Sequence, residues 1–371
     1  MWFVGLDTHS ETTVVSIRSE RGVVVLRKVV PTTSTELRRV LSRTRGRVKV
    51  ACEAGPLAPW VKRTLDTQLR EVIVCDRRRT RFGARGGSKS DHFDADRLSE
   101  CLRTGSVHAV YVPQGAHFEL RQYLLHYVRM VGERRRVKQR LNALFLESAV
   151  RVPRPERAAG RLPIRRLPTG AARQVARAYV RQLEVVDELV AISKKLLLDA
   201  ASCDPTFALL QTVPQVGQIR AATLLGVVGT VGRFRGRRTF WAYGGLGVVQ
   251  RVSSEHRVEN GRVVRDSRAR GIRRSTAGQP LLKKVLSDIA LYASVGRGEF
   301  RTLFEHHVAR GKRASVARLA LARKIASVIV AIWRSGKPYD PSLIFTERYF
   351  SGRASTPQLS QKRASARRPR R

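Results

Sequence analysis

Residues 89–102, with the sequence KSDHFDADRLSECL, place two aspartates at the start of a helix. Ser90 is a typical helix N-cap, and acidic side chains in the first turn are favoured by the helix dipole. Asp91 and Asp94 are three residues apart, so both carboxylates project from one face of this helix. The pair fits two interpretations: a site for a divalent metal ion, which prefers oxygen ligands, or an acidic first turn with solvated side chains.

The composition indicates a polyanionic partner. The chain has 371 residues, with 72 Lys and Arg against 29 Asp and Glu, and a formal net charge of +43. Because the basic residues are spread along the whole chain rather than gathered on one amphipathic anchor, nucleic acid is favoured over a membrane surface. The length predicts two or three domains, and a hydrophobic fraction of 42% argues against wholesale disorder.

The cysteines and the first residues predict a cytoplasmic protein. Cys52, Cys75, Cys101 and Cys203 have no metal-ligand spacing, so we expect them to be buried, reduced thiols. The opening apolar run reaches Asp7 too early to supply the apolar region of a secretory signal, so no such signal is expected.

The first third of the chain alternates short apolar runs with helical patterns. β-Branched and apolar runs predict strands, and amphipathic spacing predicts helices between them. The expected strands are residues 2–6, 12–17, 23–26, 48–52 and 72–75, and the expected helices are residues 33–41 and 57–68. The order βββαβαβ, followed by the helix of residues 89–102, is that of an RNase H-like α/β domain, a mixed sheet with helices on its faces.

Two further carboxylates stand where expected strands end. Asp7 ends the first strand and Glu53 ends the fourth. Those strands are neighbours in a sheet of this type, so both side chains would meet Asp91 and Asp94 from a helix crossing the same edge. Four convergent carboxylates suit two metal ions that clamp a scissile phosphate. Each acid also has a local explanation, since Asp7 can cap a turn with Thr8 and Glu53 can simply close a strand.

Three motifs carry a family resemblance. Residues 5–9 (GLDTH), 52–55 (CEAG) and 89–95 (KSDHFDA) resemble, in order, the motifs of the DEDD transposases of bacterial insertion sequences, to which pilin-gene invertases are related. The N-terminal domain of that family is similar to the RuvC Holliday-junction resolvase. The resemblance implies that Asp7, Glu53, Asp91 and Asp94 bind Mg²⁺ or Mn²⁺ and form the catalytic acids. Asp96 lies outside the matched pattern and is expected to be a helix surface residue.

The rest of the chain divides, by pattern, after an N-terminal domain of residues 1–112. Residues 113–203 contain two long helical patterns, 117–148 and 171–201, joined by a basic, Pro-rich linker at 151–169. They form either a coiled-coil arm that dimerises or an internal helical hairpin with a solvated basic face. The corresponding region of the family is a coiled coil, which favours the arm.

Residues 204–345 form a third, mainly α-helical domain. Residues 209–217, followed by a helix at 219–228, resemble a helix-hairpin-helix, whose Gly turn lets backbone amides approach phosphate. Further helices are expected at 281–293 and 315–333, with His306 and His307 between them as a surface pair rather than a metal site. Residues 346–371 are expected to form a basic, disordered tail.

A candidate nucleophile follows the segment of residues 241–247, WAYGGLG, which resembles the second-domain motif of the family. The family's reactive serine corresponds to Ser253, seven residues after Leu246, with the neighbouring Ser254 as an alternative. Glu255 stands where a glycine usually follows, and residues 255–275 form a longer segment than usual. Without the resemblance, two serines in a polar turn would be the simpler interpretation.

The resemblance implies a DNA transposase or recombinase that cuts and rejoins the strands of an insertion sequence with a metal site and a serine nucleophile. It further implies a homo-oligomer, a dimer or tetramer, associated with the nucleoid and guided by a structured RNA that the element encodes. Two alternatives stay open: a resolvase-like nuclease that uses water, and a nucleic-acid-binding protein without catalysis.

Overall fold

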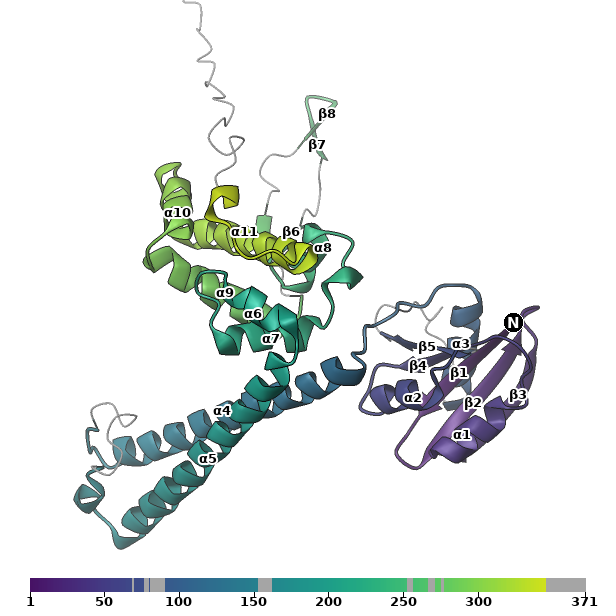
Figure 1. Ribbon diagram of the computed structural model, residues 1–371, viewed down its shortest axis with the longest axis horizontal. Coiled ribbons are helices and arrows are strands. Elements are labelled where there is room, and N and C mark those ends of the chain that lie inside the picture. Colours follow the sequence, from purple (N-terminus) through teal and green to yellow (C-terminus); the bar gives the residue numbers. More distant parts are fainter. Residues whose placement is uncertain are drawn as a thin grey trace, which may run out of the picture. The chain divides into compact units, whose positions relative to one another are not determined.

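The computed structural model describes residues 1–68, 70–76, 80, 91–152, 162–251, 256–265, 271–274 and 277–344. The chain splits into two compact units, Met1–Ala200 and Ala201–Arg371. Figure 1 shows the elements of each unit. None of the helices in the described ranges combines the length and the apolar content needed to span a membrane.

A five-stranded mixed sheet organises the start of the first unit. The strands lie in the order β3-β2-β1-β4-β5, with antiparallel pairing from β3 to β1 and parallel pairing from β1 to β5. Their bounds are β1 Trp2–Thr8, β2 Thr12–Ser19, β3 Val24–Pro31, β4 Val48–Glu53 and β5 Arg70–Cys75. The mixed α/β sheet and its element order are as the sequence predicts.

Helices cover both faces of this sheet. Alternation along β1 sends Val4 and Leu6 into a core with α1 (Ser34–Leu41) and α2 (Ala58–Leu65). Phe3 faces the other way, into a smaller core with α3 (Asp91–Arg103). The residues of β1 that share the face of Phe3 are therefore those that α3 approaches.

The first unit continues into a helical hairpin of α4 (Gly115–Glu147) and α5 (Gly170–Ser202), drawn together in Figure 1. The end of α4 packs against the beginning of α5, with the short 3₁₀ helix Ile164–Arg166 in between. The cluster that joins them is built on Leu141, Phe145, Leu167 and Ala176. The two helices are therefore antiparallel, which confirms two long helices in this region; pairing with a second copy stays a prediction.

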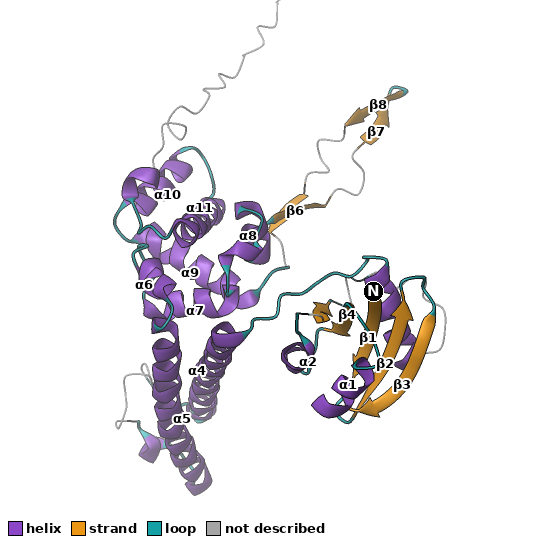
Figure 2. Ribbon diagram, turned by 45° about the vertical axis from the view of Figure 1, so that its right-hand side comes forward, coloured by secondary structure: helices purple, strands orange, loops and turns teal. Residues whose placement is uncertain are grey.

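The second unit is mainly helical, as Figure 2 shows. Helices α7, α9 and α11 supply most of its buried residues, and α7 packs beside α9. The elements are α6 Pro205–Gln211, α7 Gln218–Val228, a 3₁₀ helix Val231–Arg233, α8 Arg237–Tyr243, α9 Pro280–Val295, α10 Glu299–Ala309, α11 Ala314–Ser335 and a 3₁₀ helix Pro341–Ile344. The helices expected at 219–228, 281–293 and 315–333 are thus present.

Four short strands of the second unit were not anticipated. They form two separate two-stranded pairings, β6 with β9 and β7 with β8. The strands are β6 Val248–Arg251, β7 His256–Glu259, β8 Arg262–Arg265 and β9 Gly271–Arg274. Each has only four residues, at least one of them arginine, so apolar alternation is too weak a signal to reveal it.

The expectations for Cys203 and His307 are wrong. Cys203 is exposed, because it follows the last turn of α5, whereas the other three cysteines are buried. His307 is buried rather than on the surface, because it lies one helical turn from Leu303 and two turns from Phe300 on the inner face of α10. Burial and nearby cations lower the pKa of His307. The expected tail at 346–371 lies outside the described residues.

Candidate active site

Asp7 and Glu53 come together at one edge of the sheet. Strands β1 and β4 are parallel and adjacent, and Leu6 is in register with Cys52, so the next residues, Asp7 and Glu53, stand side by side. Both line one pocket of about 460 Å³, whose walls are the loops that follow the two strands, residues 7–10 and 53–58. The structure therefore joins two acids that are 46 residues apart in the chain.

The same pocket contains a histidine that the sequence reasoning did not single out. His9 lies in the turn after β1, and its Nε2 is 3.3 Å from Oδ2 of Asp7. Its place in the GLDTH motif, two residues after the acid, was the available signal. The imidazole is half exposed, so it can contact both the carboxylate and an incoming ligand.

The direction of α3 decides which of its ends meets this pocket. Ser16 of β2, level with Gly5 in the sheet, donates a hydrogen bond to Asp96 at 2.6 Å. Arg18, level with Phe3, pairs instead with Glu100, at 3.3 Å. Helix α3 therefore runs antiparallel to β1, with its first residues nearest to the C-terminal end of the strand. The first turn of α3 therefore lies at the edge where β1 and β4 end.

A glycine lets α3 lie this close to the sheet. A Cβ added to Gly5 would stand 1.9 Å from the carbonyl oxygen of Ala95 and 2.7 Å from the backbone nitrogen of Ser99. Only a residue without a side chain permits this approach. Gly5 is therefore a positioning residue for the helix that carries Asp91 and Asp94.

Asp96 is not the surface residue expected from the sequence. Only 16% of its side chain is exposed, and besides Ser16 it accepts a hydrogen bond from Nε of Arg27 at 2.7 Å. Asp96 therefore faces β2 and β3. Because successive residues of a helix are about 100° apart, Asp94 lies on the opposite flank of α3, away from the side that faces β2 and β3. The sequence reasoning missed this contact because Arg27 and Asp96 are 69 residues apart.

The donor chemistry of the edge fits a hard divalent cation. Asp7 and Glu53 offer carboxylate oxygens in one pocket, and oxygen ligands are those that Mg²⁺ and Mn²⁺ prefer. Asp94 is half-buried on the flank described above, and the backbone of Asp91 forms the first turn of α3. Among the side chains that the structure describes, no group of three or more His, Cys, Asp or Glu residues is placed to hold a metal ion.

In the second unit, two glycine-containing segments hold the ends of the serine segment together. The amide of Gln279 donates to the carbonyl of Tyr243 at 2.7 Å, and a Cβ on Gly278 would stand 2.5 Å from the nitrogen of Gly245. Arg323 of α11 donates to the carbonyl of Leu246 at 2.8 Å. The WAYGGLG motif is therefore hydrogen-bonded both to Gln279, at the start of α9, and to Arg323 of α11.

Ser253 and Ser254 themselves lie outside the described residues. The pairing of β6 with β9 closes the stem of their segment, and Arg251 is the last described residue before them. Near this stem, burial and the neighbouring Arg237 lower the pKa of Lys324.

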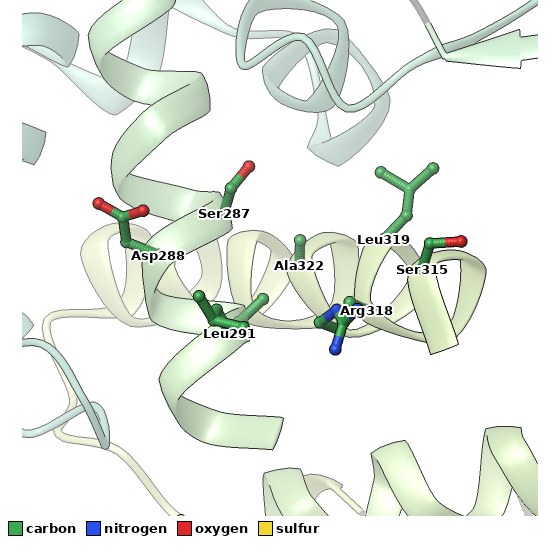
Figure 3. Close-up of a pocket in the computed structure, with 8 residues that line it drawn as sticks. Ser287, Asp288, Leu291, Ser315, Arg318, Leu319 and Ala322 are labelled. Carbon is green, nitrogen blue, oxygen red and sulfur yellow. The ribbon is translucent and has the colours of Figure 1, made fainter. Parts of the chain in front are cut away.

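A further pocket of about 270 Å³ lies between α9 and α11 (Figure 3). Its carboxylate, Asp288, is already paired with Nζ of Lys284 at 2.5 Å. Around it are mainly small and apolar side chains, among them Ser287, Ala290, Leu291, Ser315, Leu319 and Ala322. This pocket has no paired carboxylates, so it does not compete with the sheet edge as a candidate metal site.

Comparison with protein families agrees with this geometry. Residues 4–149 match a DEDD transposase model of the IS110 type, and residues 207–305 match the transposase model of the IS116/IS110/IS902 family. The chain belongs to the DEDD transposases of insertion sequences. The curated proteins contain no significant match.

The two matches divide the transposase's candidate residues between them. The first covers Asp7, Glu53, Asp91 and Asp94, and the second covers Ser253. A transposase cuts and rejoins DNA and therefore binds DNA, and DEDD transposases typically depend on a divalent metal ion. The family resemblance seen in the sequence is thus confirmed.

Proposed function

We propose that this transposase cuts and rejoins insertion-sequence DNA with a composite site of four acids and one serine. Asp7, Glu53, Asp91 and Asp94 would hold Mg²⁺ or Mn²⁺, and Ser253, or else its neighbour Ser254, would attack DNA. The observation that carries the proposal is the pocket shared by Asp7 and Glu53, with the first turn of α3 at the same edge.

The residues of the chain have distinct tasks in this reaction. Bound metal would supply charge stabilisation at the phosphate and activation of the attacking oxygen. The carboxylates of Asp7 and Glu53 position that charge, and His9 orients the carboxylate of Asp7 through the 3.3 Å contact. Gly5 and Asp96 hold α3, and with it Asp91 and Asp94, against the sheet.

Ser253 supports rejoining because its attack conserves a phosphodiester. Its hydroxyl oxygen bonds to phosphorus, the bond from phosphorus to one deoxyribose oxygen breaks, and the serine proton is balanced by the proton gained on the leaving oxygen. Attack by a different deoxyribose hydroxyl reverses the step and frees the serine. No high-energy cofactor is consumed.

The family resemblance supports a structured guide RNA as a second nucleic-acid partner. It implies an RNA encoded by the element, and the net charge of +43 is compatible with binding such a polyanion as well as DNA. Base pairing by such an RNA would select the donor and target sequences while the protein holds the backbones. Sequencing of RNA that copurifies with the protein from cells carrying the whole element tests this point.

A second seam on α5 supports a homo-oligomer built through the helical arm, residues 113–203. Four apolar residues on α5 are exposed at alternating spacings of four, three and four residues, which is the heptad pattern of a coiled coil. They are Val185, Leu189, Ile192 and Leu196, and they differ from the buried inner seam of Val186, Val190 and Leu197. Light scattering should show Leu189→Lys shifting the oligomer toward monomer, while Glu188→Lys leaves it unchanged.

Cleavage of supercoiled DNA carrying the element ends tests the site. Glu53→Gln should abolish Mg²⁺-dependent cleavage, and Ser253→Ala should abolish the covalent protein–DNA adduct, with Ser254→Ala as the matched control. If cleavage survives in both serine variants, the protein is a nuclease that uses water. If the wild-type chain binds DNA but never cuts it with any divalent ion, the catalytic proposal is wrong.

A further inference from the structure

The β7–β8 ribbon has an exposed apolar pair at its centre. Val258 of β7 is in register with Val263 of β8, and these side chains are 72% and 70% exposed. Both views draw the ribbon clear of the helices of its unit (Figures 1 and 2). In the part of the chain that the structure describes, each of its strands packs closely only on the other.

The turn of the ribbon is built to keep its two strands in register. Asn260 and Gly261 have φ values of 51° and 74°, the left-handed conformations that a two-residue type I′ hairpin requires. No atom lies within 4 Å of the Cβ that Gly261 would carry, so the tip is open to solvent. An isolated two-stranded hairpin is marginally stable in water. A hairpin with a well-defined turn and two exposed valines therefore indicates a surface that binds a partner.

The charge around the ribbon selects the class of partner. Residues 251–274 contain eight arginines against three acidic residues. At the tip, Arg262 is in register with Glu259 and both are exposed. A basic segment with an apolar centre is complementary to a nucleic-acid groove, where phosphates line the rims and base edges form the floor.

We propose that the β7–β8 ribbon enters the major groove of duplex DNA, with Val258 and Val263 against thymine methyl groups and Arg262 at the backbone. The inference rests on the proposed function, because it assumes that DNA is the substrate. The major groove of B-form DNA, about 12 Å wide, admits a two-stranded ribbon, and thymine offers an apolar methyl group there. The major groove of an RNA helix is deep and narrow, so duplex DNA fits better than duplex RNA.

Binding of the full chain to a labelled duplex of the element end, in EDTA, measures the contribution of the ribbon. Val258→Thr with Val263→Thr keeps the β-branched shape, and hence the strand propensity, while making the surface polar. This variant should bind about tenfold more weakly, the loss expected for one or two base contacts. Val23→Thr with Val25→Thr, at exposed positions of the first unit, is the matched control and should bind as the wild type does.

Two further measurements identify the partner. Replacing thymine by uracil throughout the duplex removes only the methyl groups. It should weaken DNA binding by the wild-type protein about tenfold and leave binding by the threonine variant almost unchanged. A photoreactive benzophenone side chain at position 263 should crosslink to this duplex.

Unchanged affinity of the threonine variant, or crosslinking to the element's RNA or to a second protein copy instead of DNA, would overturn the proposal. Because EDTA prevents metal-dependent chemistry, these outcomes do not depend on cleavage. A protein that binds through the ribbon but never cuts contradicts only the proposed catalysis.

Discussion

Gly5→Ala is the most direct test of how the sheet positions the helix that carries two of the acids. The new methyl group would stand 1.9 Å from the carbonyl oxygen of Ala95, whereas real Cβ contacts are essentially never shorter than 3.0 Å. The two nearest atoms, the carbonyl oxygen of Ala95 and the nitrogen of Ser99, belong to the backbone of α3, so no flexible side chain can move aside. Helix α3 must therefore withdraw from the sheet by about 1.1 Å.

This displacement has two separable consequences. Overpacking of a close contact costs about 1–3 kcal/mol of unfolding free energy. Displacement of the acids that we propose to be catalytic by about 1 Å should cost roughly 100-fold in rate, because Asp91 and Asp94 would move away from Asp7 and Glu53. The catalytic loss should therefore exceed what the fraction of unfolded protein explains.

The assay compares thermal unfolding with Mg²⁺-dependent cleavage of element DNA at a temperature where both proteins are folded. Gly132→Ala is the matched control, because Gly132 lies within α4 and no atom lies within 4 Å of its added Cβ. Alanine there should leave cleavage unchanged and favour the helix by up to about 1 kcal/mol. A Gly5→Ala protein with wild-type melting and wild-type cleavage would refute the reasoning.

Three further changes test other contacts. Asp96→Ala removes the hydrogen-bonded pair with Arg27 and should lower the free energy of unfolding by about 1–2 kcal/mol, measured in urea, because one charged partner is largely solvated. Burial raises the pKa of Cys52 and of Cys75 to about 12 from 9.0, so the contribution of these thiols to stability should be constant below pH 9 and fall as the pH rises from 9 toward 12. Gly278→Ala, at a φ of 117° and with its Cβ 2.5 Å from the nitrogen of Gly245, should lower the melting temperature by several degrees.

Each of these has a simple check. Arg27→Ala should cost less than Asp96→Ala, which also loses the hydrogen bond from Ser16, and the double variant should cost little more than Asp96→Ala alone if Arg27 acts through Asp96. The Cys52→Ala, Cys75→Ala protein should lose the alkaline fall due to thiol ionisation; an unchanged fall would show that other groups cause it. Gly236→Ala, where no atom lies near the added Cβ, is the comparison for Gly278→Ala, and equal melting of the two variants would contradict the close contact.

Local patterns were enough to place most elements of the first unit. β-Branched runs and amphipathic spacing depend on neighbouring residues, and they correctly predicted the strands β1 to β5 and the long helices α4 and α5. The strand ends that carry Asp7 and Glu53 could be paired from the sequence because a mixed sheet of this order leaves few alternatives. The short strands β7 and β8 were not predicted, because their pairing depends on a turn rather than on an apolar pattern.

By itself the sequence determined the element order, the excess of positive charge and the four acids that the family match covers, because each can be seen in consecutive residues. Only the tertiary structure decided that α3 packs closely on β1. This packing depends on the contact between Gly5 and a helix some 90 residues later in the chain. The tertiary structure likewise gave Asp96 its partners on β2 and β3 and brought His9 to Asp7. Contacts between distant residues are set by how elements pack, and packing leaves no periodic trace in either segment alone.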